Sequence, residues 1–171
     1  MDYGLDMTCC LWFAVDTLGT VFVYREYYEK DKTLSEAASD IAAICLDEKI
    51  SYTAASPDLW NRRQDTGFSG VEIMARAGLS RLVRADDRRI AGWRVVREYL
   101  KGTGGSSLKI FSTCTNLIRT LPALTHDRYI LGDASDSPHE ITHAPEALRY
   151  GLMSRPAVTV VKNEVRGFYT K

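Results

Sequence analysis

The chain has 171 residues, 45% of them hydrophobic, which is enough to bury one ordinary core, so we expect a single domain over residues 1–171. Its 22 basic and 22 acidic residues cancel, which excludes a protein that holds nucleic acid by bulk charge and restricts any basic surface to a local patch. No apolar run approaches the roughly 18 residues of a membrane span and no signal-peptide layout is present, so we expect a soluble, intracellular protein.

The amino-terminal part of the chain predicts three consecutive strands. Residues 8–15 and 20–28 are rich in apolar, β-branched and aromatic residues and show little helical periodicity. Between them, Asp16-Thr-Leu-Gly19 has the turn chemistry of a hairpin, because Asp bonds its own backbone and Gly adopts positive φ. A short first strand at Asp2-Tyr3-Gly4 would place the Asp2 carboxylate at its beginning.

A helix and a fourth strand are predicted next. The S/T-x-x-E capping box at residues 33–36 starts an apolar stripe that should end near Asp47. Residues 50–55 then predict a strand, which Pro57 ends because proline cannot continue a ladder. Asp58 would follow the carboxyl end of a central strand, where open α/β sheets place their ligands.

The rest of the chain predicts alternating short elements. They are helices over residues 69–78, 88–101, 115–121 and 144–153, strands over 82–85 and 108–111, and late extended pieces at 158–161 and 166–169. The glycine-rich loop at 102–107 lacks the lysine that a phosphate-cradling loop needs, which argues against ATP binding. A polar loop over 129–138 precedes the last helix.

The cysteines and two tryptophans favour packing over chemistry. The cysteines have neither C-x-x-C spacing nor a close histidine partner and stand in apolar runs, which predicts reduced, packed thiols. They are Cys9, Cys10, Cys45 and Cys114. Trp60 and Trp93 are also expected to pack in the interior rather than to stack on bases.

This element order predicts an α/β fold with a mixed β-sheet, three antiparallel strands followed by parallel strands, and helices on both faces. Acidic residues stand on the first strand, after the fourth strand and at the start of a late helix. Carboxylates from such positions can converge on two hard cations, which prefer oxygen ligands. Two ions about 3.5 to 4 Å apart can activate a water and stabilise the leaving oxygen of a phosphodiester. The predicted chemistry is metal-assisted hydrolysis of a nucleic-acid backbone.

Six segments together resemble the C-terminal nuclease domain of tailed-phage terminase large subunits. They are D-Y-G at 2–4, Y-R-E-Y-Y at 24–28, Y-T-A-A-S-P-D at 52–58, G-W-R at 92–94, F-S-T-C-T-N at 111–116 and H-A-P-E-A-L-R-Y at 143–150. The resemblance runs over nearly the whole chain, and its most specific part is the early D-Y-G combined with a late H-x-x-D-A-x-R-Y pattern.

The resemblance implies an RNase H-like fold and a Mg²⁺- or Mn²⁺-dependent endonuclease of bacteriophage DNA packaging. Such an enzyme cuts concatemeric double-stranded viral DNA in the host bacterial cytoplasm when packaging starts and ends. The implied partners are DNA, the terminase ATPase domain, the small terminase subunit and the portal protein. In the family the ATPase domain precedes the nuclease, so we expect an excised domain or a prophage remnant here.

By position, the resemblance implies that Asp2, Asp58 and Glu146 are catalytic ligands of two Mg²⁺ or Mn²⁺ ions. It makes His143 a further catalytic residue, as a ligand or a proton-transfer group. The chain departs from the family pattern at Glu146, where aspartate is usual, and at Thr142, where an acidic residue is common. The longer glutamate would move its carboxylate by more than about 1 Å. The chain begins one residue before Asp2, so we expect the first strand to lack its upstream half and, as a frayed strand, to hold its carboxylate poorly.

Several alternatives stay open at this point. Asp2 is otherwise a solvated terminal residue, Asp58 a helix cap or turn residue, Glu146 a complement to the helix dipole, and His143 a surface histidine. Asp6 and Glu26 are expected to be structural or solvent-facing. A catalytically degenerate domain that only binds DNA or a packaging partner is the alternative function.

Basic side chains after the fourth strand are candidate phosphate contacts. Such contacts carry little sequence information and weaken with salt, and a solvated helix face is the alternative for each. The candidates are Arg62, Arg63, Arg84, Arg88, Arg89, Lys101 and Lys109.

Overall fold

The structure is a computed structural model that describes residues 1–4, 6–62, 64, 67–102 and 107–155. Its strands are β1 (Asp2–Tyr3), β2 (Met7–Val15), β3 (Thr20–Lys30), β4 (Thr53–Ala55), β5 (Leu82–Arg84) and β6 (Ser107–Ile110). Its helices are α1 (Leu34–Ile44), α2 (Gly70–Arg76), α3 (Arg89–Lys101), α4 (Thr115–Thr120) and α5 (His143–Met153), with 3₁₀ turns η1 (Pro57–Trp60), η3 (Leu121–Ala123) and η4 (His139–Ile141). Most of the predicted glycine-rich loop and both late extended pieces lie outside the described residues.

The strands form the predicted mixed sheet. β2 pairs antiparallel with β1 and β3, and β6 pairs parallel with β3. β4 and β5 form a parallel pair of their own. The main chain of Met1 joins the two groups, because its nitrogen donates to Ala54 O (2.7 Å) and its carbonyl accepts from Ser56 N (3.2 Å). These two bonds have the parallel-ladder pattern, so the strands follow one another as β6-β3-β2-β1-β4-β5.

Local turn and cap chemistry works as the sequence predicts. Asp16 Oδ1 accepts from Leu18 N at 2.9 Å and from Thr20 N at 2.8 Å, and Gly19 has φ of 89°. Thr33 caps α1 and Ser69 caps α2, each within a reciprocal capping box. The predicted strand over 50–55 is shorter than expected: β4 begins only at Thr53, where pairing with β5 begins.

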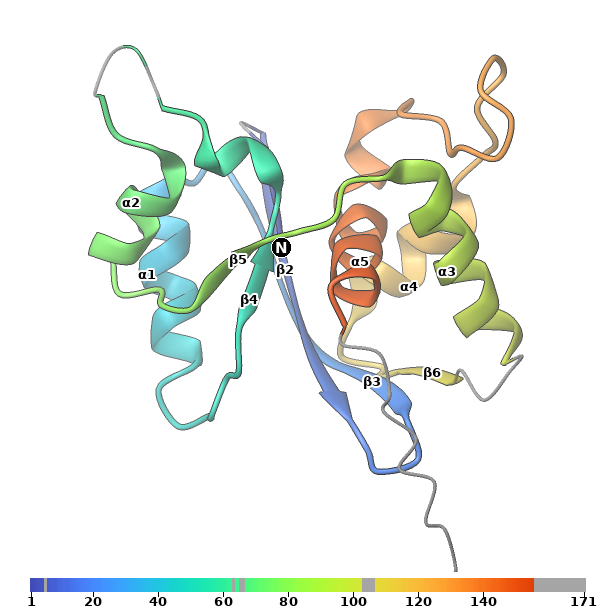
Figure 1. Cartoon of the computed structure of the whole chain (residues 1–171), viewed down its shortest axis with the longest axis horizontal. Helices are drawn as coiled ribbons and strands as arrows, with labels where there is room; N and C mark the ends of the chain where they lie inside the picture. The colour runs from blue at the N-terminus through green and yellow to red at the C-terminus, as the bar shows by residue number, and fades with distance from the viewer. Residues whose placement is uncertain (5, 63, 65–66, 103–106, 156–171) are drawn as a thin grey trace, which may run out of the picture.

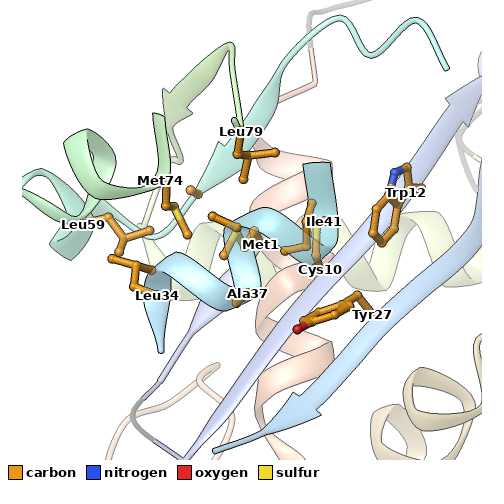
Figure 2. Close-up of a cluster of buried hydrophobic side chains, with 12 residues drawn as sticks. Met1, Cys10, Trp12, Tyr27, Leu34, Ala37, Ile41, Leu59, Met74 and Leu79 are labelled. Carbon is orange, nitrogen blue, oxygen red and sulfur yellow. The ribbon is translucent and has the colours of Figure 1, made fainter. Parts of the chain in front are cut away.

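Helices cover both faces of the sheet, with α1 and α2 on one side and α3, α4 and α5 on the other (Figure 1). Because side chains alternate along a strand, Cys10 and Trp12 of β2 join the core under α1 and α2, while Cys9 and Leu11 join the core under α5. Figure 2 shows the first of these cores, in which Ile41 of α1 lies beside Cys10. Met1 is buried in it, so the start of β1 is anchored and the predicted fraying is not observed.

The cysteines and tryptophans pack as expected. Cys9, Cys10 and Cys114 are buried free thiols, and the half-buried Cys45 accepts a hydrogen bond from Trp12 Nε1 at 3.3 Å. Trp93 is buried in the core under α5. No helix within the described ranges is long and apolar enough to cross a membrane.

Helix α5 sets the geometry of the site. It is buried on nearly all sides and contacts β1, β2, β4, α3 and α4. Close packing against α3 depends on Gly92, where an added Cβ would lie 2.6 Å from Arg149 Cγ. Likewise, an added Cβ at Gly151 would lie 2.3 Å from the Phe13 ring. The first turn of α5 lies beside the start of β1, where His143 contacts Asp2.

Candidate active site

Asp2 and His143 form the contact between β1 and the first turn of α5. His143 Nδ1 lies 2.9 Å from Asp2 Oδ2, and because an ionised carboxylate can only accept, Nδ1 is the donor. The His143 side chain is 2% exposed and that of Asp2 is 17% exposed. Burial lowers the pKa of His143, but the carboxylates of Asp2 and Asp6 outweigh it, so the net pKa is raised. His143 is therefore a buried histidine and not the surface residue of the alternative interpretation.

Asp58 lies at the end of β4, next to the same stretch of main chain. It is exposed in the first turn of η1, and its Oδ2 accepts from Ser56 Oγ at 3.3 Å. Ser56 N in turn donates to Met1 O at 3.2 Å, which sets the end of β4 beside the residue that precedes Asp2. Asp2 and Asp58 thus stand at one edge of the sheet, although 56 positions apart in the printed numbering.

Glu146 is buried in the same first turn of α5 but is held by two arginines. Its Oε1 lies 2.7 Å from Arg89 Nη1, and its Oε2 lies 2.7 Å from Arg149 Nε and 2.5 Å from Arg149 Nη2. Burial raises the pKa of Glu146, and Asp2 adds to this, while Arg149 and Arg89 oppose it. Each carboxylate oxygen of Glu146 therefore already faces a cation.

The three predicted acidic ligands share a region without forming one tight cluster. The Asp2 charge acts on Glu146, and Asp58 is linked to the start of β1 through Ser56. Among the described residues, a different group has the spacing of metal ligands. Its members are Asp6, His139 and His143, whose potential ligand atoms all lie within 4.8 Å of one another. Asp6, expected to be structural or solvent-facing, thus joins a cluster with His143.

Arg89, a predicted phosphate contact, binds three protein carboxylates in the structure. Besides Glu146, its guanidinium binds Asp133 Oδ2 at 3.0 Å and Asp136 Oδ1 at 2.8 Å. Asp133 Oδ1 also accepts from Trp93 Nε1 at 2.9 Å. These bonds tie α3, the loop before η4 and α5 together.

The other basic candidates that the structure describes are not gathered in one element. Arg88 is paired with Asp86, and Arg63 lies outside the described residues. The remaining four are exposed: Arg62, Arg84 at the end of β5, Lys101 in the last turn of α3, and Lys109 in β6. Their role in DNA binding stays a prediction.

Glu26 is structural, as expected. Its carboxylate accepts from Asn116 N at 2.8 Å and Leu117 N at 3.0 Å, and so satisfies the amino-terminal end of α4. The predicted ligands also lie apart from a large cavity of the molecule. A cavity of about 870 Å³ is lined by Trp12, Tyr24 and Tyr52 among others and does not include the predicted ligands, so chemistry and not volume identifies the candidate site.

Sequence reasoning missed Asp6 and His139. The available signal was the spacing His139-x-x-x-His143, which places two imidazoles on one side of a helical turn. For Asp6 there was no local signal, because its partner His139 stands 133 residues further along the chain.

The similarity of this chain to known proteins lies in its three-dimensional structure. No protein-family model and no curated protein matches this chain. The fold is similar to the large terminase of the thermophilic bacteriophage D6E in complex with ATP-gamma-S, with a TM-score of 0.69 and 16% identity over 88% of this chain. This chain spans only 38% of that terminase.

Two solved nuclease domains are similar over most of their own length. One is the P22 large terminase nuclease domain, with a TM-score of 0.69 and 19% identity over 89% of this chain and 77% of that one. The other is the large terminase nuclease domain of bacteriophage SPP1 with bound Mn, with a TM-score of 0.60 and 14% identity over 87% of this chain and 80% of that one. The chain therefore has the RNase H-like fold of large terminase nuclease domains.

Proposed function

We propose that this chain is a metal-dependent endonuclease domain that cleaves double-stranded viral DNA during genome packaging. Two links between the elements carry the proposal: His143 in the first turn of α5 bonds to Asp2, and Ser56, which bonds to Asp58, donates to the main chain of Met1 beside Asp2. The shared fold with the P22 and SPP1 nuclease domains supports it, and the Mn bound to the SPP1 domain supports divalent-cation chemistry.

The donor set at this edge fits a hard divalent cation in part. Asp2 and Asp58 offer carboxylate oxygens, the ligands that Mg²⁺ and Mn²⁺ prefer, and the Asp58 carboxylate is exposed. Glu146 does not fit as it stands, because Arg89 and Arg149 hold its oxygens. Asp2 and Asp58 would hold one cation. A second cation would have to replace Arg89 or Arg149 as the partner of a Glu146 oxygen.

The residues of this chain would divide the work of phosphodiester hydrolysis. A cation held there would lower the pKa of a bound water and neutralise charge on the phosphate. Asp2 and Asp58 would hold the cation, and His143 would fix the Asp2 carboxylate through its Nδ1–H. Arg62, Arg84, Lys101 and Lys109 would position the DNA backbone without reading its sequence. The ATPase domain, the small terminase subunit and the portal protein would be its partners in packaging.

Nicking of a supercoiled plasmid tests the proposal. The full chain should nick in Mn²⁺ or Mg²⁺ and stop on addition of EDTA, and Asp2→Asn and Asp58→Asn should each abolish nicking. Asp47→Asn is the matched control, because Asp47 is an exposed carboxylate after α1, and it should nick as the unaltered chain does. Metal-dependent nicking that persists in Asp58→Asn would refute the site assignment.

Arg89 and Arg149 occupy both carboxylate oxygens of Glu146. This favours a second candidate function, a degenerate domain that binds DNA without cutting it. That function predicts salt-sensitive binding of a DNA duplex with no nicking in either cation. The same plasmid assay, run beside a binding titration on the same DNA, separates the two candidates.

A further inference from the structure

A second group of potential metal ligands lies on the far side of the His143 ring from Asp2. His139 Nδ1 lies 3.3 Å from Asp6 Oδ2, and His143 Nε2 lies 3.5 Å from the same oxygen. Two atoms bound to one tetrahedral ion at about 2.1 Å stand about 3.4 Å apart. The three ligand atoms all lie within 4.8 Å of one another, so they already have the spacing of ligands around one small ion.

His143 supplies the independent sign that this group is a site. Its side chain is 2% exposed, and its Nε2 has no hydrogen-bond partner among the described residues. Leaving a buried polar atom without a partner is destabilising. Because Nδ1 donates to Asp2, loss of the second ring proton leaves the lone pair on Nε2, 3.5 Å from Asp6 Oδ2. A metal ion is the partner that such a lone pair lacks.

The surroundings keep this position open. The side chains of Asp6 and His139 are 58% and 62% exposed, so water can complete the coordination and an ion can enter. Gly4 borders the group, and an added Cβ there would lie 3.0 Å from Asp6 Oδ1 and 3.1 Å from His143 Cε1. The two imidazole rings meet edge to face, with centroids 4.5 Å apart.

We propose that Asp6, His139 and His143 bind one Zn²⁺ ion. Two imidazoles and one carboxylate suit Zn²⁺ and related transition metals, whereas Mg²⁺ and Ca²⁺ prefer all-oxygen sites. Asp2 then completes a carboxylate–histidine–zinc arrangement, in which it orients the ligating ring from behind. This site adjoins Asp2 through His143 but uses ligand atoms other than those of Asp2 and Asp58, and it does not depend on the proposed nuclease function.

Calorimetric titration of the full chain with Zn²⁺ tests the proposal. The unaltered chain should bind one ion, and His139→Ala should weaken binding at least about tenfold, as should Asp6→Asn. His139 and Asp6 are exposed, so both variants should fold, and circular dichroism checks that they do. His126→Ala is the matched control, because His126 is the exposed histidine outside the group among the three in the chain.

Two further measurements make the outcome decisive. Co²⁺ in place of Zn²⁺ should give the visible absorption of a low-coordinate nitrogen site, and that band should be lost in His139→Ala. Asp58→Asn should retain Zn²⁺ affinity even where it loses nicking. Equal Zn²⁺ affinity of His139→Ala and the unaltered chain would overturn the proposal, as would binding that His126→Ala weakens as much as His139→Ala does.

Discussion

His143 Nδ1 donates a 2.9 Å hydrogen bond to Asp2 Oδ2 and so joins residues 141 positions apart. This bond holds the first turn of α5 against β1 and gives both partners a defined orientation. The same ring carries its second nitrogen toward Asp6. One buried histidine thus connects the acidic edge proposed for catalysis with the group proposed to bind zinc.

The bond should be important for stability. His143→Ala removes a buried side chain and a hydrogen bond to a charged group, so the free energy of unfolding should fall by about 2–3 kcal/mol. Urea denaturation near neutral pH measures it, with the exposed His126→Ala as control. Equal midpoints for the two variants would contradict the assigned role.

Arg149 should be among the residues most costly to replace. It is 1% exposed and binds Glu146 through Nε and Nη2. Arg149→Met leaves Glu146 buried with Arg89 as its remaining cation, and breaking such a pair typically costs about 3–5 kcal/mol. The double variant Arg149→Met with Glu146→Gln should lose less than the sum of the two single variants. Strict additivity in urea denaturation would show that the two residues do not interact.

Gly92→Ala should reverse the usual helix preference. In an exposed helix this change stabilises by up to about 1 kcal/mol. Here the new Cβ would lie 2.6 Å from Arg149 Cγ and 2.8 Å from its Cδ, so α3 and α5 must separate, at a cost of about 1–3 kcal/mol. The thermal midpoint should therefore fall. A rise would mean that α3 and α5 are less closely packed than the structure shows.

Asp133 should contribute to acid sensitivity. Burial raises its pKa, but the bonds from Arg89 and from Ala134 N outweigh this, so the net pKa is lowered. As the pH falls, the Asp133 carboxylate is therefore protonated in the unfolded chain before it is protonated in the folded chain. The contribution to stability is present above the unfolded pKa of about 3.9 and is lost as pH falls through the folded pKa.

The matching experiment compares Asp133→Asn with the unaltered chain by urea denaturation. Asp136 and Glu146 also bind Arg89 and remain in both proteins. The difference in unfolding free energy should be largest at about pH 6.5 and smaller at about pH 3.5. The exposed Asp47→Asn should show no such trend. A pH-independent difference would mean that Asp133 acts through packing and not through its charge.

Features coded by neighbouring residues were predictable from the sequence. The hairpin follows from Asp16 and Gly19, and the starts of α1 and α2 follow from capping boxes at Thr33 and Ser69, because each involves partners within four residues. β4 was predicted too long, since its start depends on pairing with β5, which is a tertiary contact.

The site was only partly predictable for the same reason. The resemblance led to Asp2, Asp58, His143 and Glu146, of which the structure shows His143 bonded to Asp2, and Asp58 linked to the start of β1 through Ser56. The sequence could not show that Arg89 lies against Glu146, 57 residues away, and against Asp133, 44 residues away. A charge pattern indicates that α3 has a polar face, but the partners of that face are set by how α3 and α5 pack.

Anomalous diffraction from a crystal of the full chain soaked in MnCl₂ tests the central claim most directly, because it locates the ion without relying on activity. The account predicts an anomalous peak within coordination distance, about 2.2 Å, of carboxylate oxygens of both Asp2 and Asp58. A well-ordered crystal in which Mn²⁺ contacts neither carboxylate would contradict it.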